Sequence, residues 1–230
     1  MSHNKNFVIA IDGPSGAGKS TVAMLVARKL GFLYIDTGAM YRALTLKALK
    51  NKVPLDNREA LIEMAKNSKI KLEMDEDEYK VFLDGEDVSK EIRKEEVSKA
   101  SHFIASIPQI REILWRIQRS YRDTHNIVME GRDIGSVVFP DAQIKVYLDA
   151  SVDERAIRRY RQLKQQGIEC SIEDIKKDII SRDEKDTNRD IAPLVKSDDA
   201  VVIDSTSMNI NEVVNLIVDL YKKKRLEIDN

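Results

Sequence analysis

The chain has 230 residues, of which 38 are basic and 39 acidic, so its formal net charge is -1. Because 42% of the residues are hydrophobic, the chain can form a folded core, which excludes wholesale disorder. The near-zero charge argues against bulk nucleic-acid binding, and no apolar run reaches the roughly 18 residues of a membrane span. The one cysteine, Cys170, allows no internal disulfide. We therefore expect a monomer in the cytoplasm, with no membrane or nucleic-acid partner.

The amino-terminal segment reads as a strand, a loop and a helix. Residues 7–11 form a short apolar run, as in a strand that is buried on both faces. A glycine-rich loop follows, and apolar residues then recur at helical spacing up to Leu30. Gly31 occupies the position of a helix C-cap glycine.

The next segments continue this alternation and then change character. Residues 32–35 read as a strand, and Asp36 and Thr37 cap a helix that ends near Asn51. Residues 53–100 carry more charge and contain two strand-like pieces, which indicates an insertion into the core. An amphipathic helix follows Pro108.

Three further strands are expected in the rest of the chain, at residues 127–129, 144–148 and 200–203. A charged helical stretch occupies residues 151–190, and an amphipathic helix closes the chain. Five strands that alternate with helices predict an α/β fold with a five-stranded parallel sheet and helices on both faces.

Residues 13–20, with the sequence GPSGAGKS, fit the pattern G-x-x-x-x-G-K-[ST] at every fixed position. Glycines let backbone N–H groups converge on phosphate oxygens, and the following helix presents its positive amino-terminal end to the same anion. We expect Lys19 to reach the terminal phosphates and the Ser20 hydroxyl to ligate Mg²⁺. The sequence thus predicts a phosphate-binding loop, called the P-loop below.

The chain lacks the motifs that a guanine-reading switch adds to a P-loop. None of its nine glycines follows an aspartate by three residues, and neither Asn-Lys pair belongs to an N-K-x-D motif.

The distribution of arginines along the chain favours phosphoryl transfer between two phosphorylated substrates instead. Residues 111–189 contain eleven arginines and five lysines, against five and seventeen elsewhere. Arginine binds phosphate bidentately and keeps its charge, although helix-face pairing with acidic residues explains several of the eleven.

Several motifs, in this order, resemble those of the bacterial cytidylate kinases, which are P-loop nucleoside monophosphate kinases. The resemblance covers almost the whole chain. It rests on IDGPSGAGK at residues 11–19, DTGAMYR at 36–42 and GRDIGSVVFPDA at 131–142. Arg182-Asp183, Asp186 to Arg189, APL at 192–194 and DST at 204–206 complete it.

The resemblance implies phosphoryl transfer from ATP to CMP or dCMP with Mg²⁺ as cofactor. It also implies a single P-loop kinase domain, with a small α+β insertion that binds the monophosphate and a helical lid. On this interpretation the core comprises residues 1–52, 101–154 and 190–230, the insertion residues 53–100, and the lid residues 155–189.

The resemblance also assigns site residues. ATP is expected on Gly13, Pro14, Ser15, Gly16, Ala17, Gly18, Lys19, Ser20 and Thr21. CMP is expected on Thr37, Arg42, Arg132 and Arg189 through its phosphate, on Arg182 and Asp186 through its ribose, and on Arg111 and Asp133 through its base. Hydrogen-bond chemistry agrees, because the cytosine amino group can donate to Asp133 while Arg111 donates to the ring acceptors. A local ion pair between Arg132 and Asp133 is the alternative explanation of Asp133.

The sequence departs from the family at one position that reads the base. The family often has serine there, whereas counting back from Pro108 gives His102, with Ser101 beside it. Ser101 and His102 are therefore both candidates for a base contact. Arg158 and Arg159 diverge by roughly 100° on a helix, and we expect Arg158 to act in catalysis together with Lys19 and Arg132.

Two questions stay open at this level. Asp149 and Glu130 both end predicted strands, so either carboxylate could support the metal ion. The acceptor could also be UMP, AMP or a non-nucleotide, and a nucleotide-dependent regulator without catalytic activity is a further alternative. The acceptor is already an oxyanion, so catalysis requires positioning and charge neutralisation and no strong general base.

Overall fold

The structure is a computed structural model that describes residues 6–75, 78–165 and 167–229. The remaining positions, which fall within the predicted core, insertion and lid, lie outside the described residues; they are residues 1–5, 76–77, 166 and 230.

The chain divides into two compact units. The first comprises residues 1–34 and 125–230, and the second comprises residues 35–124. The predicted insertion, residues 53–100, falls within the second unit, and the predicted lid, residues 155–189, falls within the first. The boundaries of core, insertion and lid stay predictions.

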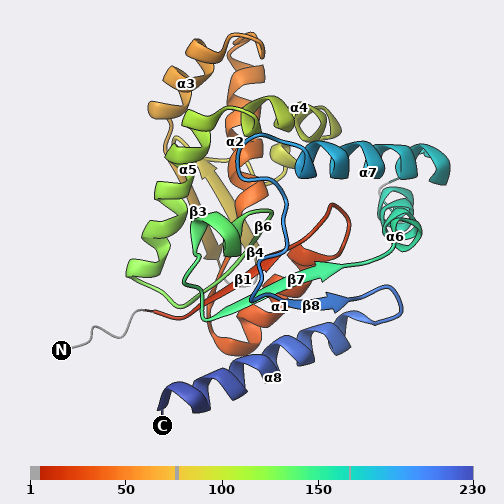
Figure 1. Cartoon of the computed structure of the whole chain (residues 1–230). Helices are drawn as coiled ribbons and strands as arrows, with labels where there is room; N and C mark the ends of the chain where they lie inside the picture. Colours follow the sequence, from red (N-terminus) through yellow and green to blue (C-terminus); the bar gives the residue numbers. More distant parts are fainter. Residues whose placement is uncertain (1–5, 76–77, 166, 230) are drawn as a thin grey trace. The chain divides into compact units, whose positions relative to one another are not determined.

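The first unit is built on parallel strands (Figure 1). The elements that belong to it wholly or in part are β1 (Val8–Asp12), α1 (Lys19–Leu30), β2 (Leu33–Asp36), β6 (Ile127–Gly131), the π-turn η3 (Ile134–Val138), β7 (Ile144–Asp149), α6 (Val152–Gln165), α7 (Ile172–Thr187), β8 (Val201–Asp204) and α8 (Ile210–Asp229). The five-stranded sheet has the order β2-β6-β1-β7-β8, and β1 pairs in parallel with both β6 and β7. The predicted α/β fold with five parallel strands is thereby confirmed.

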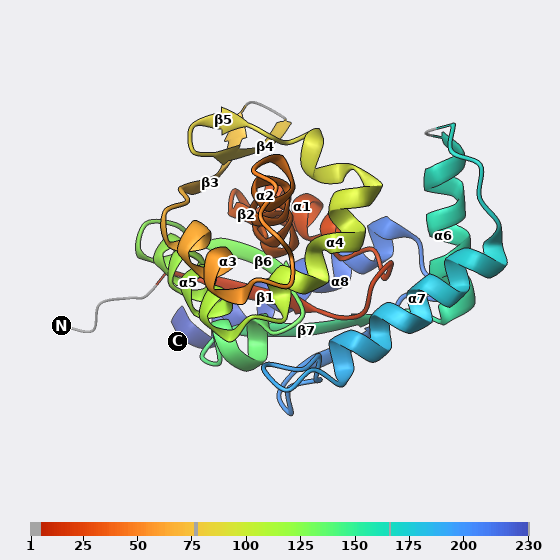
Figure 2. The ribbon, with the colours of Figure 1, turned by 90° about the horizontal axis from the view of Figure 1, so that it is seen from above.

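The sequence pattern of the central strand explains its position. All five residues of β1 are buried, as expected for a strand that has neighbours on both sides and helices over its faces. Helix α1 packs on β1 and β6, and α8 packs on α1 and β7. Helices α6 and α7 lie side by side, which Figure 2 shows from above, and pack through a small apolar cluster that includes Ala156 and Ile179.

The chain passes between the two units twice, and these two crossings lie at neighbouring points of the first unit. The chain leaves this unit after Tyr34 and returns at His125. The backbone N–H of Leu33 donates to the carbonyl oxygen of Asn126 at 2.9 Å. The Asn126 side chain also accepts a hydrogen bond from the backbone N–H of Phe7 at 2.7 Å. These two contacts hold both crossings next to the start of β1.

The second unit combines helices with a small antiparallel sheet. After the end of β2 its elements are α2 (Thr37–Lys50), α3 (Arg58–Lys66), β3 (Ile70–Asp75), β4 (Glu78–Leu83), β5 (Glu86–Asp87), the 3₁₀ turn η1 (Glu91–Arg93), α4 (Glu95–Ala105), α5 (Pro108–Ser120) and the 3₁₀ turn η2 (Tyr121–Asp123). Helix α2 packs against α4 and β4. The Asp36 carboxylate accepts a hydrogen bond from the Ala39 N–H at 2.9 Å, which confirms the predicted cap of α2.

Two helices of the second unit were not predicted from the sequence. Helix α3 follows Asn57, whose side chain caps it by accepting from the Ala60 N–H, so a capping signal was present. Helix α4 follows Lys94 and has no side-chain cap. Among the described residues, no helix combines the length and apolar character that a membrane crossing requires.

Candidate phosphate-binding site

The P-loop connects β1 to α1, as predicted, and its backbone explains two of its glycines. Gly13 has φ +149°, and a Cβ atom there would lie 2.0 Å from the carbonyl oxygen of Leu148. No other residue fits so close to a neighbouring backbone. Gly18 has φ +92° at the N-cap of α1, another conformation that favours glycine. The loop therefore ends at the amino terminus of a helix, where N–H groups are available to an anion.

Lys19 is buried at the start of α1, with 5% of its surface exposed. Its Nζ donates a hydrogen bond to the carbonyl oxygen of Pro14 at 2.7 Å, so the side chain folds back across the loop. Burial, followed by the positive charge of Arg132, lowers the pKa of Lys19 to about 7, while Glu130 and Asp186 oppose this shift. A phosphate placed beside Lys19 would add to the negative charge of these carboxylates and favour the ammonium form.

The structure separates the two carboxylates that the sequence left open. The Ser20 hydroxyl donates to Oε1 of Glu130 at 2.7 Å. Asp149 instead uses its Oδ1 to accept the backbone N–H of Ala150 at 2.8 Å. A hydroxyl beside a carboxylate supplies the hard oxygen donors that Mg²⁺ prefers, so the Ser20–Glu130 pair fits this ion.

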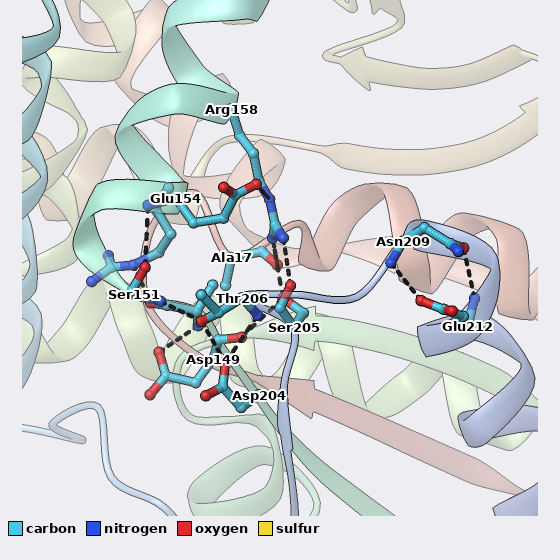
Figure 3. Close-up of polar contacts among 12 residues, drawn as sticks. Ala17, Asp149, Ser151, Glu154, Arg158, Asp204, Ser205, Thr206, Asn209 and Glu212 are labelled. Atoms are coloured by element: carbon cyan, nitrogen blue, oxygen red, sulfur yellow. Dashed lines mark hydrogen bonds and ion pairs between the residues drawn. The ribbon is translucent and has the colours of Figure 1, made fainter.

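Arg158 on α6 contacts the P-loop (Figure 3). Its guanidinium donates to the carbonyl oxygen of Ala17 at 3.4 Å and to the carbonyl oxygen of Ser205 at 2.6 Å. It also donates to the Ser205 hydroxyl at 3.1 Å. Arg159 hydrogen-bonds to a glutamine on its own helix instead. This difference supports the choice of Arg158 over Arg159, although an ATP contact stays a prediction.

An ion pair that was not predicted from the sequence is hydrogen-bonded to the P-loop backbone at Ser15. Arg155 on α6, 4% exposed, bonds to Asp183 on α7 at 2.6 Å and donates to the Ser15 carbonyl oxygen at 2.9 Å. Asp183 in turn accepts the Ser15 N–H at 3.3 Å. The backbone N–H and carbonyl groups of Ser15 are thus both hydrogen-bonded by the Arg155–Asp183 ion pair, which also links helices α6 and α7.

The arginines that were predicted to bind CMP and lie in the first unit all act on Asp186 through their charges. Arg132 Nε bonds to Asp186 Oδ2 at 2.7 Å. Arg189 lies 4.0 Å from Asp186 and 3.7 Å from Asp133, and its Nε donates to the Ala192 carbonyl oxygen at 2.5 Å. The three positive charges of Arg132, Arg189 and Arg182 lower the pKa of Asp186 although its burial acts in the opposite direction. Arg132 and Arg189 thus lie beside Asp186, a carboxylate that stays ionised, and Arg189 also lies near Asp133.

In the second unit, Thr37 and Arg42 lie on the first two turns of α2. Thr37 is buried at the first helical position. The Arg42 guanidinium bonds to the Asp36 carboxylate at 2.9 Å. The same carboxylate caps the helix, so it orients the arginine along the start of α2.

Arg111 on α5 is 1% exposed and is therefore a buried charge of the second unit. Its guanidinium lies 5.5 Å from the centre of the Tyr41 ring and 5.3 Å from that of Trp115. Its Nη1 donates to the carbonyl oxygen of Ala105 at 3.1 Å. Aromatic rings on a guanidinium are favourable contacts and restrict its orientation, as a group that reads a planar base requires.

The two alternative base contacts, Ser101 and His102, differ in exposure. The Ser101 hydroxyl is half-buried and donates to the Ser98 carbonyl oxygen at 2.8 Å. The His102 ring is exposed, lies 2.7 Å from the Lys99 carbonyl oxygen through Nδ1, and contacts the Phe103 ring at a tilt of 35°. Each side chain is held by its own helix, α4, so the choice between them stays open.

Comparison with known proteins places this arrangement in a family. The family model described as cytidylate kinase matches residues 9–223. A cytidylate kinase from Aeromonas salmonicida (strain A449) is 49% identical over 211 residues, which cover 92% of each chain. One from Caldanaerobacter subterraneus subsp. tengcongensis is 49% identical over 220 residues, which cover 96% of each chain. A solved structure of an uncharacterized protein from Eubacterium ventriosum has the same fold, with a TM-score of 0.53, 12% identity, and coverage of 93% of this chain and 97% of that chain.

Proposed function

We propose a residue-level mechanism from one premise: this chain belongs to the cytidylate kinase family, and it transfers the γ-phosphoryl group of ATP to CMP or dCMP, giving ADP and CDP or dCDP. One observation of the structure carries the proposal. Lys19, the Ser20–Glu130 pair and the ion pair of Arg132 with Asp186 belong to one unit, and their charges act on one another. Such a concentration of cations and hard oxygen atoms suits phosphoryl transfer between two anions.

On the donor side, the P-loop N–H groups and the amino terminus of α1 bind the phosphates of ATP, and Lys19 contacts the terminal ones. Ser20 and Glu130 would hold Mg²⁺, which neutralises phosphate charge when it is bound. The Arg155–Asp183 pair keeps the Ser15 peptide in position for this loop geometry. Residues 13–21 are therefore proposed as the ATP-binding segment.

The transfer itself forms a bond between a CMP phosphate oxygen and the γ-phosphorus and breaks the bond from that phosphorus to the bridging oxygen of ADP. The departing electron pair stays on the β-phosphate, and no proton has to be removed from the acceptor. Lys19, Arg132 and Arg158 are proposed to stabilise the charge that spreads over the transferred group. Arg158 would have to exchange its hydrogen bonds to Ser205 for phosphate oxygens.

On the acceptor side, we assign the phosphate of CMP to four residues, Thr37, Arg42, Arg132 and Arg189, and the ribose to Arg182 and Asp186. Asp133 and Arg111 read the base, with Ser101 or His102 as a further contact. The low exposure of Arg111 and Asp133 supports this role, because a buried polar group rejects a base that leaves it without a partner. Uracil would present a carbonyl to the Asp133 carboxylate.

We also propose a monomer as the acting species. Both substrates are nucleotides of the cytoplasm, so we place the reaction there. One alternative is a kinase of this fold that acts on UMP, AMP or another small acceptor. A more distant alternative is a regulator that binds nucleotide but transfers no phosphoryl group.

A panel of acceptors tests the proposed substrate. ADP release from ATP and Mg²⁺ is measured with CMP, dCMP, UMP, AMP and GMP in parallel. We expect kcat/KM for CMP and dCMP to exceed that for AMP and GMP by about 10³-fold or more, because unpaired buried polar groups penalise the wrong base strongly. Release with AMP alone would favour the other kinase, and silence with every acceptor would favour the regulator.

Replacing Glu130 by glutamine tests the metal assignment. We expect the Mg²⁺ concentration for half-maximal rate to rise roughly 10- to 100-fold, as is typical when an oxygen group that supports a metal is altered. The measurement is a Mg²⁺ titration at saturating ATP and CMP. Asp149→Asn is the matched control, because Asp149 also ends a strand of the sheet but faces Ala150 N–H. Equal shifts in both variants would remove Glu130 from the metal site.

A further inference from the structure

The end of β1 carries a buried carboxylate that the mechanism above does not use. Asp12 is the last residue of this strand, and 6% of its surface is exposed. Its Oδ1 accepts the backbone N–H of Ile134 at 2.8 Å, and its Oδ2 accepts the backbone N–H of Gly135 at 2.7 Å. Both carboxylate oxygens are therefore bound to consecutive amides of one loop.

These two amides begin the π-turn η3, directly after Arg132 and Asp133. Free N–H groups at the start of a helical turn attract a negative charge, so Asp12 serves as the anion for this turn. Two hydrogen bonds donated to one planar carboxylate fix the direction of the backbone as well as its distance. The backbone immediately before them determines where the Arg132 and Asp133 side chains point.

The other neighbours of Asp12 belong to the donor side. Asp12 directly precedes Gly13, the residue whose backbone lies against the Leu148 carbonyl oxygen. In the sheet, Asp12 is paired with Gly131, the residue before Arg132. Asp12 is thus the covalent neighbour of the P-loop and the hydrogen-bond partner of the loop that carries Arg132 and Asp133.

The charge of Asp12 is maintained at a cost. Burial raises its pKa to about 6, the Gly135 and Ile134 amides act in the opposite direction, the negative charge of Asp133 raises the pKa further and Lys19 lowers it. Asp12 is accordingly a carboxylate at neutral pH and can accept both hydrogen bonds. Burial of the Asp12 charge is unfavourable by itself, and a neutral residue could fill the same space at a lower cost in desolvation. This suggests that the hydrogen bonds of Asp12 do more than join two loops.

We propose that Asp12 is a positioning residue for the acceptor nucleotide: by accepting two amides of the loop that follows Arg132 and Asp133, it sets these side chains relative to the P-loop. The inference rests on the proposed function of Arg132 and Asp133 in binding CMP. It adds a residue that touches neither substrate and acts on the acceptor through the backbone.

Asp12→Asn is the direct test, because an asparagine keeps the shape but offers one acceptor oxygen and turns an amino group toward an N–H. We expect KM for CMP to rise roughly 10- to 100-fold, as the loss of one charged hydrogen bond predicts, with KM for ATP within about threefold. A merely structural role would lower the fraction of active enzyme, and therefore kcat, with both KM values unchanged. That outcome would overturn the proposal.

Two further variants keep the test decisive if Asp12→Asn folds poorly. Gly135→Ala crowds this contact from the loop side, because its Cβ would approach the Lys145 side chain tightly, at 3.2 Å, and would touch Asp12 Oδ2 at 3.4 Å. We expect the same selective rise in KM for CMP, of smaller size. Asp149→Asn, a strand-end control, should leave both KM values unchanged.

Asp133→Asn separates this inference from the function on which it rests. A rise in KM for CMP in Asp133→Asn, without one in Asp12→Asn or Gly135→Ala, would refute the role of Asp12 and leave the acceptor assignment intact. Unchanged KM values for CMP in all three variants would overturn both.

Discussion

Replacing Lys19 by methionine is expected to lower kcat by about 10³-fold or more, while KM for ATP changes by less than about tenfold. The reason is the position of Lys19, which is buried beneath the P-loop with its Nζ against the Pro14 carbonyl oxygen. Backbone N–H groups of the loop still bind the phosphates in the variant. The charge that develops on the transferred group loses its cation, however, and this loss is felt mainly in the transition state. Steady-state rates of ADP formation at saturating CMP provide the measurement.

Lys29→Met is the matched control on the same helix. Lys29 lies in the last turn of α1, is exposed, and donates to the Asn215 side chain at 2.9 Å. We expect its kcat to stay within about twofold of the original value, because a surface charge at this distance contributes little. A Lys19→Met protein with normal turnover would show that the P-loop lysine takes no part in the transfer.

Replacing Arg132 by lysine is expected to lower kcat/KM for CMP by about 10²- to 10³-fold, although the positive charge is kept. Arg132 bonds to Asp186 through Nε at 2.7 Å and to the Gly131 carbonyl oxygen through Nη1 at 3.2 Å, and a guanidinium with five N–H groups has further donors for a phosphate. Asp186, with Glu130 and Asp183, raises the pKa of Arg132 despite its burial, so the charge is permanent. A lysine offers one point charge and cannot serve Asp186 and a phosphate with separate nitrogen atoms.

The measurement is a full CMP and ATP saturation series on the variant. Arg159→Lys is the control, since Arg159 also carries its charge on a partly exposed guanidinium but bonds to Gln162 on its own helix. We expect the kcat/KM values of this control to stay within about twofold of the original. If Arg132→Lys were as active as the control, the bidentate role of Arg132 would be disproved.

Local features of the fold could be predicted from the sequence because their causes are local. The strand before the P-loop, the αL glycine at position 31 and the Asp36 cap of α2 each follow from a few neighbouring residues. The same holds for the P-loop itself, in which glycine is required at Gly13 by the closeness of the Leu148 carbonyl oxygen. Helix α4 was missed because no side chain caps it, whereas α3 was missed although Asn57 provides a capping signal.

Features that depend on contacts between distant segments could not be predicted. The Arg155–Asp183 ion pair and its hydrogen bonds to Ser15 join three segments of the chain. In the sequence, nothing distinguishes Arg155 and Asp183 from the other charged residues of the helical region. The choice between Glu130 and Asp149 likewise depends on which strand end faces Ser20. Sequence spacing could bring both carboxylates to the same edge of the sheet, but only the structure shows their hydrogen-bond partners.

The two points at which the chain leaves and re-enters the first unit, near Leu33 and Asn126, adjoin one another, so the segment between them could be exchanged as one piece. Since a backbone hydrogen bond of 2.9 Å already holds the two crossing points together, a linker of a few residues could close the gap left by excision. Grafts of the corresponding segment from relatives could be joined at the same two points, and they would replace only the edge strand β2 of the parallel sheet. Such a graft would exchange the acceptor residues Thr37, Arg42 and Arg111, whereas Arg132 and Asp133 would stay with the ATP-binding machinery.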